Sequence, residues 1–472
     1  MRAFKIASAY LLLVVLLGAC MTYYQRYREF NQSFENGNLE QAKKLLEADD
    51  KGESRKSRFL YFTNLGVVNS MLSNYEESNA WFEKAYIFGE DYRKNYLNYA
   101  ASFLTNPKMT VYPGEDHEHL LVPYYKSINY LKQGNFEAAL VEARRMDIRL
   151  NQFSDKYKSD NKFQEDAFID LLIGLIYDAS KDYNNAFIAY RNAYNTYENE
   201  YKTRFGLSAP DQLKKDLLRT AKLSGFYTEV EQYEREFKMK TPEPMATNEG
   251  RVLFIWHNGL GPVKDEWAIN FVIIKGAGGV VNFQNEELGL NFNFIMSGDD
   301  KSSLGDLRTL RVVFPKYVER ELLYTDASVQ WDGGSSRLFK AEPVNDIARQ
   351  LLKQRMLKEL GESLLRVAIK KAAEQAIRQQ SEGAAVAASI INMATEQADT
   401  RNWQTLPHSI YYTWLEGEAG KKDLNLKLLS SRFSSYNTQK NISVEFEKGR
   451  TKVLTYHSLD VSPRYNPVMD SY

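Results

Sequence analysis

Apolar residues recur at helical spacing through the first half of the chain, from Tyr23 to about Lys240. A short motif repeats within this pattern and marks the start of the second helix of each predicted helix pair. In each copy the first residue turns the chain, a large apolar residue packs between helices, and a small residue permits close helix approach. The clear copies are Gly37-Asn38-Leu39 with Ala42, Ser73-Asn74-Tyr75 with Ser78, Gly134-Asn135-Phe136 with Ala139, and Lys181-Asp182-Tyr183 with Ala186; a weaker one is Gly225-Phe226-Tyr227 with Val230.

Two of these copies carry more of a known repeat pattern. Around the second copy lie Phe62, Leu65, Gly66, Phe82 and Ala85, and around the fourth lie Ile173, Gly174, Tyr177, Tyr190 and Ala193. The spacing resembles the tetratricopeptide repeat, which implies a solenoid whose concave face receives a peptide or protein segment. Two roles stay open for that face, namely binding of an external partner and packing against the chain's own second half.

The pattern changes after Thr241-Pro242-Glu243-Pro244, because prolines cannot continue a helix. We predict a linker over 241–250 between a helical domain, 20–240, and a C-terminal domain, 251–472. Short apolar runs predict strands at 251–256, 267–275, 280–283, 290–296, 311–315 and 327–331, then a helical region over 342–397, and further strands at 409–414, 423–429, 442–447 and 452–456. The predicted class is α+β, an all-α solenoid followed by a β–α–β domain with a long helical insert.

The first residues have the pattern of a secretory leader. Arg2 and Lys5 precede an apolar run, 10–17, which is too short to span a bilayer comfortably. Leu17-Gly18-Ala19-Cys20 resembles the lipobox of bacterial lipoproteins, which implies a signal peptide over 1–19 and a lipid such as palmitate on Cys20. The alternative is an ordinary signal peptide with an incidental cysteine. Met21 follows with no acidic residue beside it, which by resemblance to proteobacterial sorting rules implies the outer membrane, facing the periplasm.

Three further segments together resemble an uncharacterised family of proteobacterial outer-membrane lipoproteins that contain tetratricopeptide-like repeats. They are 112–116 with 124–131 and 139–145, His257-Asn258-Gly259-Leu260-Gly261-Pro262-Val263-Lys264-Asp265-Glu266, and Ala398-Asp399-Thr400-Arg401-Asn402-Trp403-Gln404-Thr405-Leu406-Pro407. The resemblance covers most of the chain after the leader. It places the protein beside lipoproteins that activate penicillin-binding proteins, and it therefore implies a role in the cell envelope.

Composition and motifs favour binding over catalysis. The 61 Lys and Arg residues balance 61 Asp and Glu residues, so no net charge points to nucleic acid. Cys20 is the only cysteine in the 472-residue chain, which leaves no second cysteine for a disulfide or a metal site. We recognise no HExxH, phosphate-loop or nucleophile-elbow motif, and we predict no enzyme activity, cofactor or metal site. Asp116-His117-Glu118-His119 reads as a solvated loop, His257 as a turn residue, and the glycines after Lys275 as a hairpin.

Polar residues in two of the family-like segments are the candidates for partner binding. Asn258 and Lys264 come from the second, and Arg401 and Trp403 come from the third. An arginine binds carboxylates well and a tryptophan is a strong anchor. The alternative, which we favour for the last two, is that an Asp399–Arg401 pair locks the helix-to-strand corner with Trp403 in the core.

The sequence thus predicts a non-enzymatic, lipid-anchored envelope adaptor that binds protein partners through its solenoid. Two alternatives stay open, an accessory regulator of peptidoglycan synthesis or envelope assembly and, less favoured, a hydrolase of an envelope polymer. The hydrolase would need two converging carboxylates.

Overall fold

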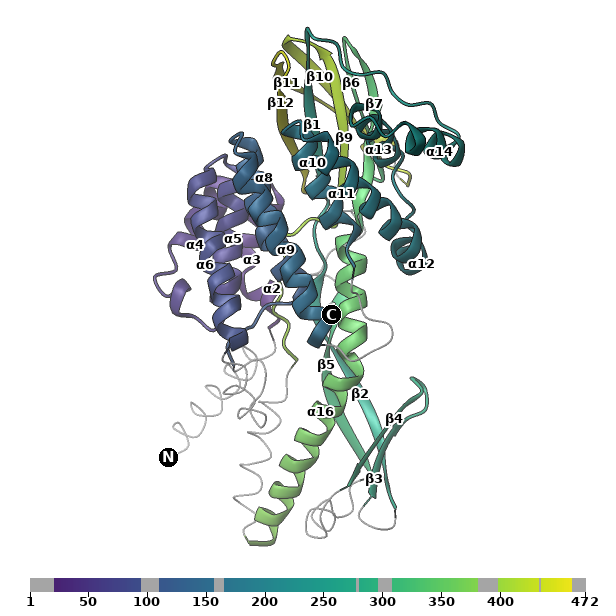
Figure 1. Cartoon of the computed structure of the whole chain (residues 1–472). Coiled ribbons are helices and arrows are strands. Elements are labelled where there is room, and N and C mark those ends of the chain that lie inside the picture. The colour runs from purple at the N-terminus through teal and green to yellow at the C-terminus, as the bar shows by residue number, and fades with distance from the viewer. Residues whose placement is uncertain are drawn as a thin grey trace.

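The computed structural model describes residues 21–94, 110–156, 165–276, 280–295, 308–380, 398–432 and 434–460. Cys20, the leader and most of the Ala-rich stretch after Gly383 lie outside these residues. Helices fill the first half of the chain (Figure 1). They are α2 Tyr23–Arg26, α3 Arg28–Glu35, α4 Leu39–Glu47, η1 Gly52–Ser54, α5 Arg58–Met71, α6 Tyr75–Lys94, α8 Asp116–Lys132, α9 Phe136–Lys156, α10 Ala167–Ala179, α11 Tyr183–Thr196, η3 Tyr197–Tyr201, α12 Lys202–Phe205, α13 Asp211–Leu223 and α14 Tyr227–Phe237.

The repeated motif opens the second helix of every pair, as predicted. Helices α4, α6, α9, α11 and α14 begin at the large apolar residue of the five copies. The turn residue two positions earlier has a positive φ in all five, including the non-glycine residues Ser73 at 66° and Lys181 at 67°. The small residue is buried in each copy, and the Ser78 hydroxyl donates to the Gly66 carbonyl across the pair at 2.7 Å. The local sequence therefore determines where each pair turns.

Glycine lets the two helices of a pair approach closely. A Cβ on Gly66 would lie 2.6 Å from the Phe82 ring, and one on Gly174 would lie 2.4 Å from the Tyr190 ring. These are two of the positions on which the resemblance to the tetratricopeptide pattern rests.

Strands fill most of the second half, with one long helix between them in sequence. The strands are β1 Glu249–Asn258, β2 Val263–Lys275, β3 Val280–Asn285, β4 Leu290–Ile295, β5 Thr309–Val318, β6 Asp326–Trp331, β7 Gly334–Arg337 and β8 Phe339–Glu342, followed by α16 Val344–Gln380, β9 Ser409–Glu418, β10 Gly420–Leu429, η5 Ser434–Tyr436, β11 Thr438–Phe446 and β12 Thr451–Ser458. The sequence did not predict β7 or β8, because β7 contains no apolar residue and β8 is only four residues long. His257, predicted to be in a turn, lies within β1.

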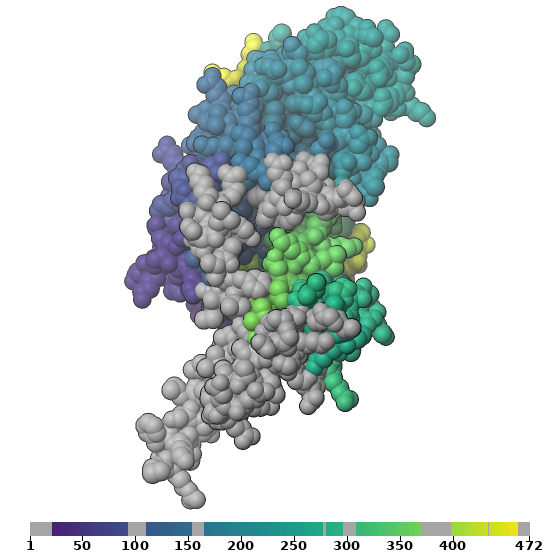
Figure 2. Space-filling model, turned by 60° about the horizontal axis from the view of Figure 1, so that its bottom comes forward, coloured from purple at the N-terminus to yellow at the C-terminus, as the bar shows by residue number. Residues whose placement is uncertain are grey.

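The strands form three four-stranded sheets. Two of them, β12-β1-β9-β8 and β11-β10-β6-β7, enclose a common core that includes Val252, Phe254, Leu415 and Leu426. Strand β12 runs parallel to β1, and the other pairings are antiparallel. The third sheet, β4-β3-β2-β5, packs on α16 through a separate core that includes Phe271, Phe283 and Leu364. This third sheet and α16 extend away from the other two sheets (Figure 1), and Figure 2 shows the described part of α16 beside the third sheet.

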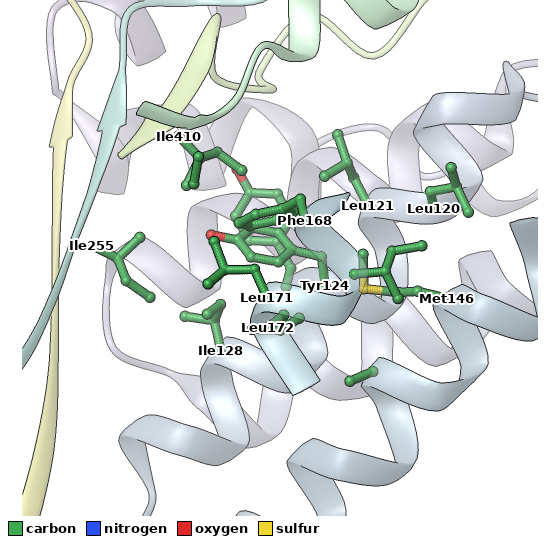
Figure 3. Packing of buried hydrophobic residues seen from close by; sticks show 14 of the residues in the cluster. Leu120, Leu121, Tyr124, Ile128, Met146, Phe168, Leu171, Leu172, Ile255 and Ile410 are labelled. Atoms are coloured by element: carbon green, nitrogen blue, oxygen red, sulfur yellow. The ribbon is translucent and has the colours of Figure 1, made fainter. Parts of the chain in front are cut away.

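The outer face of the β12-β1-β9-β8 sheet packs on the helical half. Ile255 of β1 and Ile410 of β9 face Tyr124 and Ile128 of α8 and Leu171 of α10 (Figure 3). One continuous core therefore joins the helix pairs to the second half of the chain. None of the described helices is long and apolar enough to cross a membrane.

Candidate functional site

Three of the four predicted binding residues lie where the two halves of the chain meet. Lys264 is 2% exposed, and its ammonium group forms an ion pair with Glu115 at the start of α8. Trp403 is 1% exposed, with its ring centroid 6.0 Å from that of Phe82 and 5.8 Å from that of Tyr125. The Trp403 indole nitrogen donates to Thr405. Both side chains thus contact other parts of this chain. This corrects the prediction of an external partner for Lys264, whereas Trp403 packs in the core, which is the alternative that its sequence favoured.

Asn258 and Arg401 are also buried. The Asn258 amide donates to the Tyr324 carbonyl at 2.8 Å and accepts from the Ser458 hydroxyl at 3.1 Å. Arg401 forms an ion pair with Asp399 at 2.7 Å and donates to the Thr110 carbonyl at 3.0 Å. The Asp399–Arg401 pair at the helix-to-strand corner is the role that its sequence favoured. The hydrogen bond from Arg401 to Thr110 also connects this corner to the segment that precedes α8.

The Asp116-His117-Glu118-His119 segment corrects the prediction of a solvated loop, because it forms the first turn of α8 and is buried. The second half packs over this turn, and the backbone N–H of Trp403 donates to Glu118 at 2.5 Å. Burial raises the pKa of Glu118 to about 7 and lowers that of His117 to about 4. Among the described residues no group of three or more acidic, histidine or cysteine side chains could hold a metal ion.

A buried charge cluster joins three elements farther along the contact. Asp178 of α10 accepts from Arg219 of α13 and, at 2.9 Å, from Arg251 of β1. The Tyr190 hydroxyl donates to the same carboxylate at 3.0 Å. Although burial opposes ionisation, the two guanidinium groups hold the pKa of Asp178 below its ordinary value. This carboxylate therefore links two helix pairs to the sheet.

The first helices of the pairs have little surface left for a partner. Almost every residue of α5 from Phe59 to Ser70 is buried, and so is α8 from Asp116 to Asn129. The chain's own second half covers them: Asn64 accepts from Thr405 at 2.9 Å, and Tyr124 and His257 share a hydrogen bond of 2.7 Å. Of the two roles left open for this side of the solenoid, the structure shows packing against the second half.

The second helices leave an open groove on the other side. This groove of about 720 Å³ lies between α6 and the α8–α9 pair, and all the residues that line it belong to the helical half. They are Glu76, Asn79, Ala80, Glu83, Lys126, Tyr130, Gln133, Asn135, Glu142 and Arg145. We call it the α6 groove.

Charges of both signs line the α6 groove in a fixed arrangement. Lys126, only 3% exposed, forms ion pairs with Glu83 and, at 2.7 Å, with Glu142. Arg145 lies 3.2 Å from Glu83 and 3.1 Å from Glu142. Burial opposes ionisation of Glu83, yet Lys126 and Arg145 hold its pKa below the ordinary value. The groove therefore presents preorganised charged groups rather than an apolar surface.

Hydrogen bonds behind the α6 groove hold its floor in place. Asn129 is fully buried and accepts from Ser70 at 2.6 Å. Its amide donates to Ser78 and to Asn79, each at 2.8 Å. Since Asn79 lines the groove, this network connects the groove to the interior of two helix pairs.

A second hollow, of about 510 Å³, lies along the next part of α6. It combines Phe62, Ile87, Phe88 and Tyr92 with Glu53, Arg58, Lys84 and Asp91. Ile87 is 50% exposed, and the Arg58 guanidinium lies 5.0 Å from the Phe88 ring centroid. Helix α6 thus has a polar groove on the α8–α9 side and a partly aromatic hollow on the α5 side.

An acidic hollow of about 350 Å³ lies at the start of α10. Asp147, Glu165, Asp166 and Asp170 line it together with Asn151, Asn192, Asn195 and Thr196, as well as Leu150 and Ile169. Burial, with repulsion from Asp147, Asp166 and Glu165, raises the pKa of Asp170 to about 7. The acids therefore destabilise one another when all are ionised.

We expect Asp170→Asn to stabilise the protein at pH 8, by about 1–2 kcal/mol, and to change little near pH 4. Between the ordinary pKa of 3.8 and about 7 the unfolded chain ionises first, so wild-type stability declines as the pH rises. Above pH 7 the folded chain carries the buried charge, which asparagine removes. Urea unfolding at both pH values measures the effect, and an equal change at pH 4 and pH 8 would contradict this cause.

None of the residues that line the α6 groove was among the candidates predicted from the sequence. Glu142 and Arg145 belong to a segment on which the family resemblance rests, and their spacing of three places them on one helix face. This spacing was visible in the sequence, but it could not show that Glu83 of α6 and Lys126 of α8 lie beside Glu142 and Arg145. Only the packing of α6 beside α8 brings the four charges together.

Comparisons with known proteins establish no family for this chain. No family model matches it, and no curated protein matches it. Among solved structures, MamA is matched over 46% of this chain and 96% of its own, at 10% identity and a TM-score of 0.28. BtubC from P. vanneervenii is matched over 46% of this chain and 81% of its own, at 12% identity and a TM-score of 0.31. These scores are too low to bear on fold or function.

Proposed function

We propose that this protein is a non-enzymatic, lipid-anchored envelope adaptor that binds a protein segment in the α6 groove. The groove carries the proposal, because it is open, has a fixed floor and presents ion-paired side chains from three helices. Its partner is a segment with charged and amide side chains, which can form hydrogen bonds with the charged groups that line the groove. The repeated motif, which resembles the tetratricopeptide pattern, is in keeping with a protein ligand.

The proposed site differs from the usual one of such solenoids. Peptides usually bind the concave face, but the second half of this chain packs on the first helices. We place the partner on α6, since all the residues that line the groove belong to the helical half. The second half then stabilises the arrangement of the helix pairs by packing on their first helices.

Filling the groove tests this site. Ala80 is exposed and lines the groove, so Ala80→Trp adds bulk there without disturbing the core. We expect a photo-crosslinker at Glu76, in intact cells, to capture an envelope protein, and we expect Ala80→Trp to reduce capture about tenfold or more. Ala419→Trp, at an exposed site between β9 and β10, is the matched control and keeps wild-type capture. Capture that is equal in both variants contradicts a partner in the groove.

The anchor is tested separately at Cys20. Cys20→Ala removes the only thiol that a lipid can modify. We expect labelled palmitate to enter the wild-type chain, and we expect the variant to lose both the label and its place in the outer-membrane fraction. Wild-type protein that stays with that membrane without any label would contradict the lipid anchor.

A further inference from the structure

A basic hollow lies where the described chain begins. It has a volume of about 250 Å³ and is lined by Met21, Tyr23, Arg26, Tyr27, Arg55, Lys56, Ser57, Thr400 and Arg401. Four of these residues are cations, and none of them carries a carboxylate. Three segments far apart in sequence meet here, namely α2, the loop before α5 and the corner before β9. The hollow therefore forms only when these three segments are brought together in the folded protein.

Two of the cations are positioned by acids that do not line the hollow. Arg55 forms an ion pair with Asp49 at 2.6 Å, and Arg401 forms one with Asp399 at 2.7 Å. Arg401 is only 6% exposed and is therefore fixed in the wall. Arg26 and Lys56 are exposed residues that line the same hollow. The hollow combines a rigid wall with two accessible cations.

The remaining lining groups suit a phosphate ester. Ser57 and Thr400 carry hydroxyl groups, and the Thr400 hydroxyl already accepts from the backbone N–H of Tyr23 at 3.0 Å, so its own hydrogen remains to be donated. The rings of Tyr23 and Tyr27 lie side by side with centroids 4.6 Å apart, which provides an amphipathic surface for a glycerol group. Arginine and lysine together are the usual ligands of phosphate.

The place of the hollow in the chain indicates where the phosphate comes from. Met21 lines the hollow and follows Cys20 directly, so the Cα atoms of the two residues are separated by about 3.8 Å. We propose that the hollow binds the phosphate of a phospholipid headgroup in the membrane that holds the Cys20 lipid, an inference that rests on the anchor proposed above. A headgroup bound beside the anchor holds the protein at a second point and sets its orientation on the membrane.

Lipid titration of the full-length protein in nonionic detergent tests the proposal. Dihexanoylphosphatidylglycerol is added, and phosphorus NMR line broadening follows its binding. We expect saturable binding that Arg26→Glu with Lys56→Glu weakens about tenfold or more, because both accessible cations are reversed. Lys421→Glu with Lys440→Glu, at exposed positions on β10 and β11, makes the same change of charge and leaves binding within about twofold. Circular dichroism confirms that both variants fold.

Two further measurements distinguish a lipid headgroup from free phosphate, and the phosphate site from the lipid anchor. Inorganic phosphate at the lipid concentration is expected not to displace the lipid, and displacement by it would overturn the assignment to a headgroup. No saturable lipid binding, or an equal loss in both double variants, overturns the hollow as a site. Palmitate labelling of the wild type is measured in parallel: labelling without lipid binding leaves the anchor and removes the site, whereas binding without labelling removes the anchor and the membrane role built on it.

Discussion

Replacing Asp178 by asparagine is expected to destabilise the protein by about 3–5 kcal/mol, because it leaves two buried guanidinium groups without their shared counter-ion. Arg219 and Arg251 are 5% and 6% exposed, so water cannot take the place of the carboxylate. Two other acids compensate for only part of the loss. Asp216 lies 3.9 Å from Arg219, but burial raises its pKa to about 7. Glu416 lies 2.7 Å from Arg251, but its side chain is 33% exposed. The free energy of unfolding in urea measures the change.

The matched control is an aspartate in an ion pair whose own side chain is largely exposed. Asp332 is 64% exposed at its side chain and lies 2.7 Å from Lys422, so Asp332→Asn should cost about 0–1 kcal/mol. Because Asp178 contacts both halves, fluorescence and circular dichroism should report one coincident transition in the wild type. A loss below about 1 kcal/mol for Asp178→Asn would show that the buried cluster contributes little to the joining of the halves.

Removing the Trp403 side chain is expected to cost about 3–5 kcal/mol, because it opens a cavity between the helical half and the second half. The ring is packed against Phe82 and Tyr125, and both of these side chains are fully or almost fully buried. Trp403→Ala therefore affects the same boundary as Asp178→Asn, but through packing instead of charge. Urea unfolding again provides the measurement.

This variant also distinguishes the two roles that the sequence allowed for Trp403. If the ring packs in the core, Trp403→Ala loses stability, and Tyr227→Ala, at a side chain 68% exposed on α14, changes it by less than about 0.5 kcal/mol. If the ring anchors an external partner, Trp403→Ala keeps its stability and loses capture of that partner. The second result would contradict the burial described here.

Local elements of the fold were largely predictable from the sequence. The five turn motifs located the starts of α4, α6, α9, α11 and α14, because a residue with positive φ followed by a large and then a small side chain has few other uses. Alternating apolar runs located most strands for the same local reason. β7 was missed because Gly334-Ser335-Ser336-Arg337 has no apolar pattern, and its pairing with β6 is a tertiary property.

The role of the candidate residues was harder to predict. Lys264 and Arg401 are polar residues in loop-like segments, and such residues are commonly exposed. In this protein each finds a counter-ion, Glu115 or Asp399, and is buried with it. The Asp399–Arg401 pair could be predicted because its two residues lie two positions apart, but only the approach of the two halves brings Glu115 to Lys264.

By itself, then, the sequence determined the helix pairs, the change from helices to strands near Pro244 and the position of the single cysteine, because each depends on residues close together in the chain. Only the tertiary structure decided that the second half covers the first helices, that Lys126 meets Glu83 beside α6, and that Arg26 meets Arg401 beside Met21. Such contacts join residues far apart in sequence. Their free energy comes from burial and charge pairing across the fold, which no local pattern records.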